Sequence, residues 1–467
     1  MFTLLINARA GFGRIGLILI LPFIILVIAY GAYQLFFIPD PVVNGLEAFD
    51  ILPAYKSVKL DSENVRSIDI SIYQEGKEIN LLKDTPETGE KVYTLEIKPK
   101  EMGLTDGRAI ITIKAEAGIL KKIQYDIESR IDTVPPVLEV EKAPAIVYQG
   151  SGGFTVLRAS DAESVFIKLV DKAQSGEDKT FRAFKVPSDS DIKSDSSEKS
   201  GNEPEGTTMP DRRMGARTAY NAFFPAPFDI SDGSVFYAVA RDAAGNQSIM
   251  ALPTSLKMKK FKSSVINIDD AFINRVVSPL LNETYIADAA DAFRKVNEEW
   301  RRQSVGSLID ISKKSEPGIL WKGRFLQLKN SKVMATYGDR RTYRYKGKNI
   351  SKSVHLGYDL ASFAKAPVEA ANAGIVRFAD NLSIYGNTVI IDHGLGLMSL
   401  YGHLSTIMVT EGQEVIKGQI IAKTGSTGLA GGDHLHYGML MHGYEVSPIY
   451  WWDPNWIKIN VVDVMEN

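Results

Sequence analysis

The six histidines of this 467-residue chain all lie in its last quarter, between His355 and His442, and two of them are paired at a short spacing. His434 and His436 are two positions apart. On a β-strand such residues project from the same face, so both imidazoles would point into one space while Leu435 packs behind them. The spacing therefore predicts a pocket lined by histidines.

A carboxylate accompanies another of the histidines. His355 and Asp359 are four positions apart, which suits one face of a helical turn or of an extended segment. Two histidines and one carboxylate form a ligand set of catalytic zinc, in which a fourth position is left for water. Two further histidines would remain beside the metal for proton transfer and charge stabilisation.

The motifs around these residues resemble those of a known family. They are His355–Ser362, Gly386–Gly394, Leu400–Leu404, Gly425–Gly428 and His434–Gly438. The segment from about 319 to 458 is similar to the lysostaphin-type (LytM-like) zinc metallopeptidases, which cut peptide cross-links in bacterial cell walls. This resemblance implies an antiparallel β domain that binds one Zn²⁺ per chain.

The resemblance also implies a role for each residue of the site. The zinc ligands would be His355, Asp359 and His436. The catalytic residues would be His403 and His434, which assist the bound water and the tetrahedral intermediate. The sequence leaves open which of these two is the general base.

Three more side chains of this segment carry expectations. Arg341 is a candidate for binding a stem-peptide carboxylate through two hydrogen bonds, and a structural ion pair is the alternative. His393, in an Asp-His-Gly run at a predicted strand end, is expected to be a hydrogen-bonded structural residue. His442 precedes Gly443 and is expected to be an exposed turn residue.

The start of the chain predicts a membrane anchor. Residues 15–37 carry no charge, and a helix of this length rises about 34 Å, enough to cross the hydrocarbon core. Arg9 and Arg14 precede the stretch, so residues 1–14 would form a cytoplasmic tail and the rest would lie outside. A cleaved signal peptide is the rival, but its apolar region is usually only about 7–15 residues long.

Two all-β modules are predicted to follow the anchor. Residues 40–133 alternate apolar and polar side chains in short runs, which is typical of antiparallel strands. Residues 134–260 have a Pro135-Pro136 entry and a final strand followed by the turn cluster Asp242–Asn246, as in bacterial immunoglobulin-like β-sandwiches. Residues 187–217 interrupt the second module with almost no large apolar side chain, so we expect a disordered insertion there.

A helical linker is predicted between the second module and the peptidase domain, at 264–318. Ile286, Ala289, Phe293, Val296 and Trp300 recur at spacings of three and four, which indicates one apolar helical stripe. An earlier helix is expected at about 268–278, ended or kinked near Pro279. The stripe either packs against a neighbouring element or covers the active groove as an autoinhibitory element.

The fold class expected overall is mainly β, with a zinc peptidase domain at 319–464. The function favoured is a zinc-dependent endopeptidase that hydrolyses peptidoglycan cross-links. Its expected partners are peptidoglycan and the bacterial inner membrane, with the C-terminal domains in the periplasm or cell-envelope space. The alternatives are a catalytically silent scaffold that activates other wall hydrolases and a polysaccharide-binding spacer. A net charge of −2 argues against nucleic-acid binding.

Overall fold

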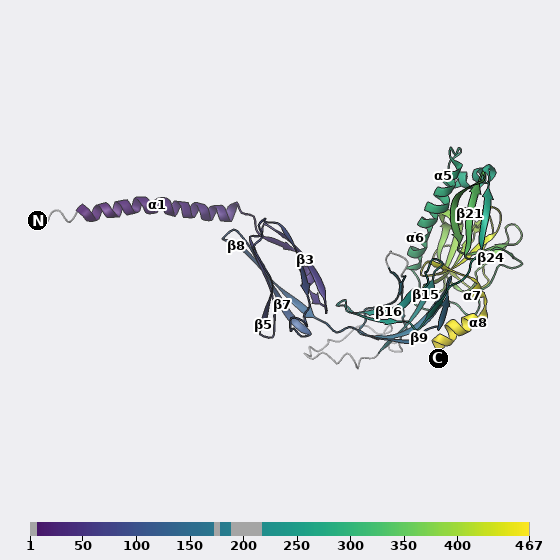
Figure 1. Ribbon diagram of the computed structural model, residues 1–467, viewed down its shortest axis with the longest axis horizontal. Coiled ribbons are helices and arrows are strands. Elements are labelled where there is room, and N and C mark those ends of the chain that lie inside the picture. The colour runs from purple at the N-terminus through teal and green to yellow at the C-terminus, as the bar shows by residue number, and fades with distance from the viewer. Residues whose placement is uncertain (1–6, 172–177, 188–216, 467) are drawn as a thin grey trace. The chain divides into compact units, whose positions relative to one another are not determined.

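The computed structural model describes residues 7–171, 178–187 and 217–466 (Figure 1). The chain divides into two compact units. Unit 1 contains residues 1–135 together with Asp242–Asn246, and unit 2 contains residues 136–241 and 247–467. Both units are built mainly from strands, which confirms the mainly β prediction.

Unit 1 begins with the long helix α1 (Asn7–Phe36) and continues as a β-sandwich. Among the helices of the described residues, none combines the length and the hydropathy of a membrane span. The two sheets have the strand orders β1-β3-β6 and β2-β8-β7-β4-β5. The strands are β1 (Val42–Asn44), β2 (Ile51–Leu52), β3 (Lys56–Glu63), β4 (Ser67–Gln74), β5 (Lys77–Asp84), β6 (Lys91–Ile97), β7 (Gly107–Ala117) and β8 (Lys121–Ile131), with a 3₁₀ turn at Leu46–Phe49.

The alternation seen in the sequence of unit 1 matches its burial. In β3, Val58, Leu60 and Ser62 are buried while the residues between them are exposed. Strands have a side-chain period of two, so one face of each strand lines the core between the sheets. The core is aliphatic, with Ile70, Ile111 and their neighbours excluded from solvent.

Unit 2 begins with a second sandwich of two four-stranded sheets, β14-β15-β11-β9 and β13-β12-β16-β17, and a parallel pair β10-β18. Its strands are β9 (Val137–Lys142), β10 (Ile146–Tyr148), β11 (Ser151–Ser160), β12 (Ser164–Val170), β13 (Lys179–Arg182), β14 (Phe184–Lys185), β15 (Thr218–Ala226), β16 (Val235–Arg241), β17 (Gln247–Ala251) and β18 (Ser255–Lys257). The insertion predicted at 187–217 lies outside the described residues except for its two end positions.

The helical linker differs from the prediction at its start. Ser263–Ile268 form strand β19, which pairs in parallel with β21. Sheet pairing satisfies the backbone of this segment and buries Ile268, so tertiary context decides its structure. The helical part comprises α3 (Asp270–Phe272), a π-helical turn (Ile273–Val277), α4 (Ser278–Leu281), α5 (Ala289–Arg294), a second π-helical turn (Lys295–Trp300) and α6 (Arg301–Ser312).

Pro279 does not end the first helix where the sequence suggested. Helical structure continues to Leu281 and stops at Asn282, whose φ is 55°. Pro279 stands at the start of α4, directly after the wider π-helical turn. A π-helical turn changes the hydrogen-bond ladder, which accommodates a residue that has no N–H to donate.

The domain that follows the linker helices is centred on one large sheet, β20-β23-β31-β27-β26-β25-β29, with β32 paired to β31. Two smaller sheets, β19-β21-β22 and β24-β30-β28, accompany it. The strands are β20 (Lys332–Ala335), β21 (Asp339–Tyr345), β22 (Lys348–His355), β23 (Tyr358–Ala361), β24 (Pro367–Glu369), β25 (Gly374–Asn381), β26 (Asn387–Asp392), β27 (Leu397–Gly402), β28 (Thr406–Ile407), β29 (Glu414–Val415), β30 (Ile420–Lys423), β31 (Leu435–Met441) and β32 (Tyr444–Val446).

Both faces of the large sheet are covered, so its central strands are buried throughout. On β27, Leu397 and Tyr401 belong to a cluster with the C-terminal aromatic residues. Met398 and Leu400, on the opposite face, belong to a cluster with the linker helices. Because side chains alternate along a strand, His436 on β31 projects toward the helix-covered face.

The apolar stripe of the linker packs against this sheet. Phe293 and Val296 are fully buried in the cluster that contains Tyr343 and Leu440. The Phe293 ring lies 4.7 Å from that of Tyr343. Packing is therefore the observed role of the stripe.

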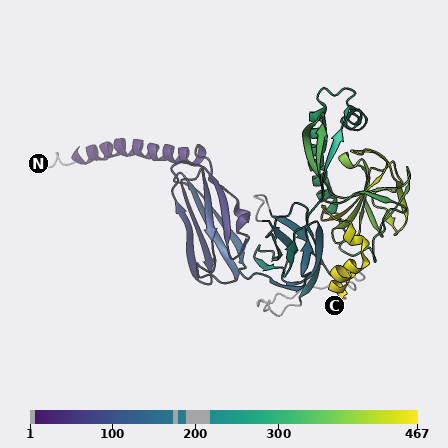
Figure 2. The same cartoon turned by 45° about the vertical axis from the view of Figure 1, so that its right-hand side comes forward.

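The C-terminal segment packs on the other face of the sheet. It consists of α7 (Ile449–Trp452), α8 (Pro454–Ile457), a π-helical turn (Lys458–Val462) and α9 (Asp463–Glu466). Trp451 is buried, with its ring 5.8 Å from Phe223 of β15 and 5.6 Å from Trp321. Figure 2 shows these yellow helices beside the second sandwich. An aromatic core therefore joins the second sandwich to the C-terminal domain.

Replacing Phe293 by Ala should lower the free energy of unfolding by about 3–5 kcal/mol, since the change empties a buried ring site. Urea or thermal unfolding of the variant measures the loss. Glu299→Ala, at an exposed position of the same helical segment, is the control and should stay within about 0.5 kcal/mol of the parent. Equal stability of the two variants would contradict the packing role.

Candidate metal and catalytic site

Strand pairing brings the predicted metal ligands together. His355 ends β22, and Asp359 lies on β23, directly opposite His436 of β31 in the antiparallel register. The short connection between β22 and β23 returns Asp359 to the side of His355. The three residues are thus brought together by neighbouring strands, and they form a group that could hold a metal ion.

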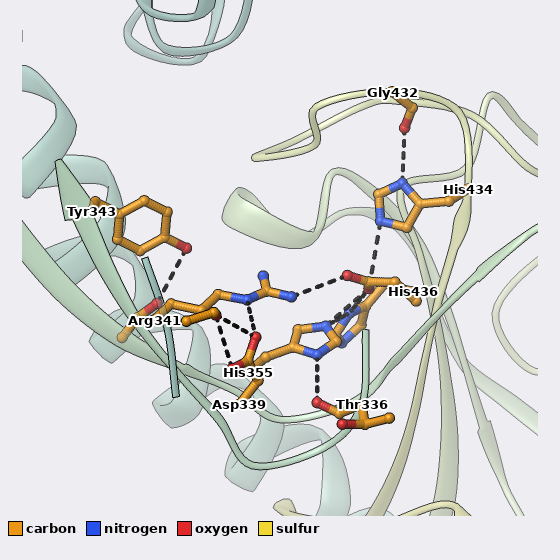
Figure 3. A network of polar contacts seen from close by, with 11 residues as sticks. Thr336, Asp339, Arg341, Tyr343, His355, Gly432, His434 and His436 are labelled. Carbon is orange, nitrogen blue, oxygen red and sulfur yellow. Dashed lines mark hydrogen bonds and ion pairs between the residues drawn. The ribbon is translucent and has the colours of Figure 1, made fainter. Parts of the chain in front are cut away.

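The three ligand atoms of this triad lie close together, and Figure 3 shows the His355 and His436 rings with their polar contacts. His355 Nε2 lies 2.9 Å from Asp359 Oδ1 and 3.1 Å from His436 Nδ1, and His436 Nδ1 lies 3.1 Å from Asp359 Oδ1. Zinc with tetrahedral ligands at about 2.0–2.1 Å holds its donor atoms roughly 3.3 Å apart. The donor atoms and their spacing therefore fit a zinc ion.

A hydrogen bond on the side of the ring away from the triad sets the orientation of His355. Its Nδ1–H donates to the Thr336 carbonyl at 3.1 Å. A carbonyl only accepts, so the proton of the neutral ring is placed on Nδ1 and the lone pair of Nε2 faces the triad. Metal-binding histidines typically have such an outer hydrogen bond, which fixes tautomer and ring orientation.

The two remaining motif histidines lie beside the triad and are oriented in the same way. His403 follows β27 with a φ of 61°, and its Nδ1–H donates to the Thr427 carbonyl at 2.8 Å. His434 lies just before β31, and its Nδ1–H donates to the Gly432 carbonyl at 2.8 Å. The two ring centroids are 4.9 Å apart. Both rings line the cavity over the triad, and His434 Nε2 lies 3.5 Å from Asp359 Oδ1.

The protonation of these groups suits a metal site. Burial acts to raise the pKa of Asp359, but the neighbouring imidazoles, His355 first and then His434 and His436, hold this pKa well below its ordinary value. Burial, followed by the neighbouring His434 and His436, lowers the pKa of His403 far below 6.5. Burial also lowers the pKa of His436 to about 4. An ionised carboxylate and neutral imidazoles are the forms that bind metal.

Arg341 pairs with acidic residues of the site. Its Nη2 lies 3.3 Å from Asp359 Oδ2, and its Nε lies 3.5 Å from Asp339 Oδ2 (Figure 3). Ser264 Oγ donates to the same Asp339 carboxylate. The structure therefore contains the ion pair that was the alternative to substrate binding, and Arg341 contacts Asp359 through the oxygen that the histidines do not use.

Glycine at position 357 leaves room for a ligand ring. A Cβ at Gly357 would lie 2.6 Å from both Cε1 and Nε2 of His436 and 2.8 Å from the Tyr437 carbonyl oxygen. The Nε2 atom itself is buried without a hydrogen-bond partner among the described residues. The backbone thus approaches the outer edge of the His436 ring closely enough to fix its position.

A cavity of about 120 Å³ lies over the triad and is lined by further residues that the motifs did not indicate. Tyr385 packs its ring 5.4 Å from that of His436 and donates its hydroxyl to Glu445, a carboxyl whose pKa burial raises to about 7. Arg301 reaches the cavity from α6. No motif or residue spacing in the sequence indicates Tyr385 or Arg301, because each reaches the site only through tertiary packing.

The two other histidines lie away from the triad. His393 is fully buried, with Nδ1 bonded to the Ala373 carbonyl at 2.7 Å and Nε2 at 2.8 Å from Ser399 Oγ, which confirms a structural role. His442 is at a turn, with a φ of 51°, but the prediction of an exposed side chain is wrong. Its Nε2 donates to the Phe223 carbonyl at 3.0 Å, because the second sandwich packs against this turn.

These features define a histidine-rich metallopeptidase-like site in a β domain, and comparison with known proteins gives its family. Residues 353–448 match peptidase family M23. The chain therefore carries an M23 (LytM-type) peptidase domain at its C-terminus, as the motifs predicted.

Several curated proteins are similar to this segment. The chain is 40% identical over 96 residues to the DD-carboxypeptidase/endopeptidase Mpg of Neisseria meningitidis serogroup B, covering 21% of this chain and 22% of the relative. It is 41% identical over 93 residues to the peptidoglycan DD-endopeptidase ShyA of Vibrio cholerae serotype O1, covering 20% and 22%. The match thus spans about a fifth of the length of these relatives.

Solved structures are similar to the same region. The catalytic domain of lysostaphin from Staphylococcus simulans is 29% identical, with a TM-score of 0.22, covering 26% of this chain and 92% of that one. A putative peptidase M23 from Pseudomonas aeruginosa is 17% identical with a TM-score of 0.35, covering 64% and 92%.

Replacing Gly357 by Ala should displace the His436 ring and weaken metal binding by about 10–100-fold, an effect of the size seen when the surroundings of a ligand are disturbed. Zinc titration against a competing chelator measures the change. Gly306→Ala, in α6 where no atom lies within 4 Å of an added Cβ and φ is not positive, is the control for a glycine change with no bearing on the ring. Unchanged zinc affinity in Gly357→Ala would show that the position of the His436 ring does not depend on the absence of a side chain at residue 357.

Proposed function

We propose that this protein is a zinc-dependent endopeptidase that hydrolyses peptide cross-links of bacterial peptidoglycan. The observation that carries the proposal is the convergence of His355 Nε2, Asp359 Oδ1 and His436 Nδ1 within 3.1 Å of one another. The M23 match and relatives named as peptidoglycan DD-endopeptidases support it.

One Zn²⁺ per chain would be held by the triad. When bound, zinc polarises a carbonyl and lowers the pKa of its water. The chain supplies the rest of the chemistry. His403 and His434 line the cavity, where one of them, neutral, would accept at Nε2 the proton of the attacking water. The other would donate a hydrogen bond to the developing oxyanion from Nε2 when its ring is protonated on both nitrogens. Tyr385 shields one side of the His436 ring.

A catalytically silent scaffold remains the second reading of the domain. Such a protein needs the fold of the site but not its proton-transfer groups. In this chain His403 and His434 each have one nitrogen fixed by a backbone carbonyl and line the cavity with the triad, the arrangement that a catalytic site requires. Hydrolysis of purified wall material by the zinc-loaded protein decides between the two.

We also propose that residues 15–37 anchor the chain in the bacterial inner membrane, with the domains after them in the periplasm. The support is the sequence, which places an uncharged stretch after two arginines and before the first acidic residue, Asp40. An anchor would hold the peptidase domain on the side of the membrane that carries the wall.

Removing one metal ligand should remove the metal. Full-length protein purified in detergent is expected to contain about one zinc per chain, because three ligands with an open position form a catalytic zinc site. His436→Ala and Asp359→Ala should each lose most of it, as measured by elemental analysis. Full zinc occupancy in both variants would show that these residues are not the ligands.

Replacing His403 or His434 should separate binding from chemistry. Either Ala variant is expected to keep zinc while wall-fragment release falls by about 10²–10⁴-fold. The double variant should lose less than the product of the single losses, since groups that serve one transition state act together.

His393→Ala, normalised to folded protein, is the control for these variants and should stay within a few-fold of the parent. Loss of zinc in His434→Ala would make that residue a ligand. Full activity in the same variant would remove its catalytic role.

Membrane fractionation tests the anchor. The full-length protein should sediment with membranes and resist carbonate extraction, whereas a variant with two Lys residues introduced at Leu26 and Val27 should be released, because charges at the centre of a span are costly. Release of both proteins by carbonate would contradict an integral anchor.

A further inference from the structure

Two guanidinium groups line the catalytic cavity, and their environments differ. Arg341 is engaged by Asp339 and Asp359, as described above. Arg301 is the first residue of α6, and its side chain lines the cavity. It forms no ion pair with any acidic residue in the part of the chain that the structure describes. The cavity therefore contains one arginine that is paired with two carboxylates and one arginine that no carboxylate of the described residues contacts within ion-pair distance, although the charge of Arg301 acts on the buried Glu445.

Arg301 is held in place by a buried amide. Its Nε donates to the Asn297 carbonyl at 3.1 Å, and its Nη2 donates to Asn297 Oδ1 at 3.0 Å. Asn297 is fully buried, and its Nδ2 donates to Ser351 Oγ of β22 at 2.8 Å. Both hydrogen bonds of Arg301 go to neutral acceptors, so its orientation is fixed while its charge is left to attract an anion.

We propose that Arg301 is a specificity-determining residue that binds a free carboxylate of the substrate peptide close to the scissile bond. A positioned guanidinium binds a carboxylate through charge-assisted hydrogen bonds. This inference rests on the proposed peptidase function. The residue lies outside the segment that matches peptidase family M23, residues 353–448, so the preference would be a property that this chain adds through its linker helix.

A purely structural role is the competing explanation. Arg301 acts on the buried Glu445, whose pKa it lowers against a larger effect of burial. Loss of Arg301 could then disturb Tyr385, which donates to Glu445 and packs on His436. Such a disturbance would affect every substrate equally, whereas loss of a carboxylate contact affects only substrates that carry the carboxylate.

The test compares two cross-linked peptide dimers that differ in one group. One has a free carboxylate on the residue next to the scissile bond, and the other has a carboxamide there. The zinc-loaded full-length protein and its Arg301→Gln, Arg301→Lys and Arg302→Gln variants are assayed on both. Arg302 is the exposed neighbour on the same helix, does not line the cavity, and is the matched control.

We expect Arg301→Gln to lose about 10–100-fold in kcat/KM on the carboxylate peptide, mainly through KM, the effect typical of one charge-assisted contact. The carboxamide peptide should be cut at the parent's rate, Arg301→Lys should fall between, and Arg302→Gln should match the parent. Zinc content and Tm should be equal in all four proteins.

Equal losses on both peptides would overturn the inference in favour of the structural role, and no loss on either would show that Arg301 does not contact substrate. These two outcomes leave the proposed peptidase function intact, because the parent protein cuts the peptides in either case. A parent protein that cuts neither peptide nor wall material overturns the proposed function and, with it, this inference.

Discussion

The antiparallel pairing of β23 with β31 is the interaction on which the site depends. It places Asp359 opposite His436, and the turn before β23 brings His355 to the same point. Pairing fixes this register because Leu360, Leu435 and their neighbours fill the aromatic core on the other face. A slip of one residue would turn every side chain to the wrong side, so the packing of an apolar core sets the position of the polar ligands.

The carboxylate of Asp359 has two oxygens with separate tasks. Oδ1 faces the histidines, and Oδ2 faces Arg341. The arginine thereby helps to hold the carboxylate in one rotamer and its negative charge in a buried place, where an unpaired ion is costly. The neighbouring imidazoles, His355 above all, outweigh burial and hold the pKa of Asp359 well below its ordinary value, so this carboxylate is ionised before any metal arrives.

Sequence reasoning was successful where spacing carries the information. The period of two at His434 and His436 gave their common direction, and alternation gave the strands of unit 1. It failed where a distant partner decides. His442 looked like a turn residue until the Phe223 carbonyl of the second sandwich was placed beside it. Ser263–Ile268 became a strand because β21 offers a pairing edge. Arg301 and Tyr385 reach the cavity through packing between segments far apart in the chain, for which one sequence holds no local signal.

The linker helices have a consequence for dividing this protein into fragments. They cover Met398, Leu400 and Leu440 on one face of the large sheet and contribute part of the cavity wall. A recombinant domain begun at residue 319 would contain every motif of the family yet expose this apolar face to water, which favours aggregation. The smallest soluble catalytic fragment is therefore set by the covering layer, and its N-terminal limit lies before β19.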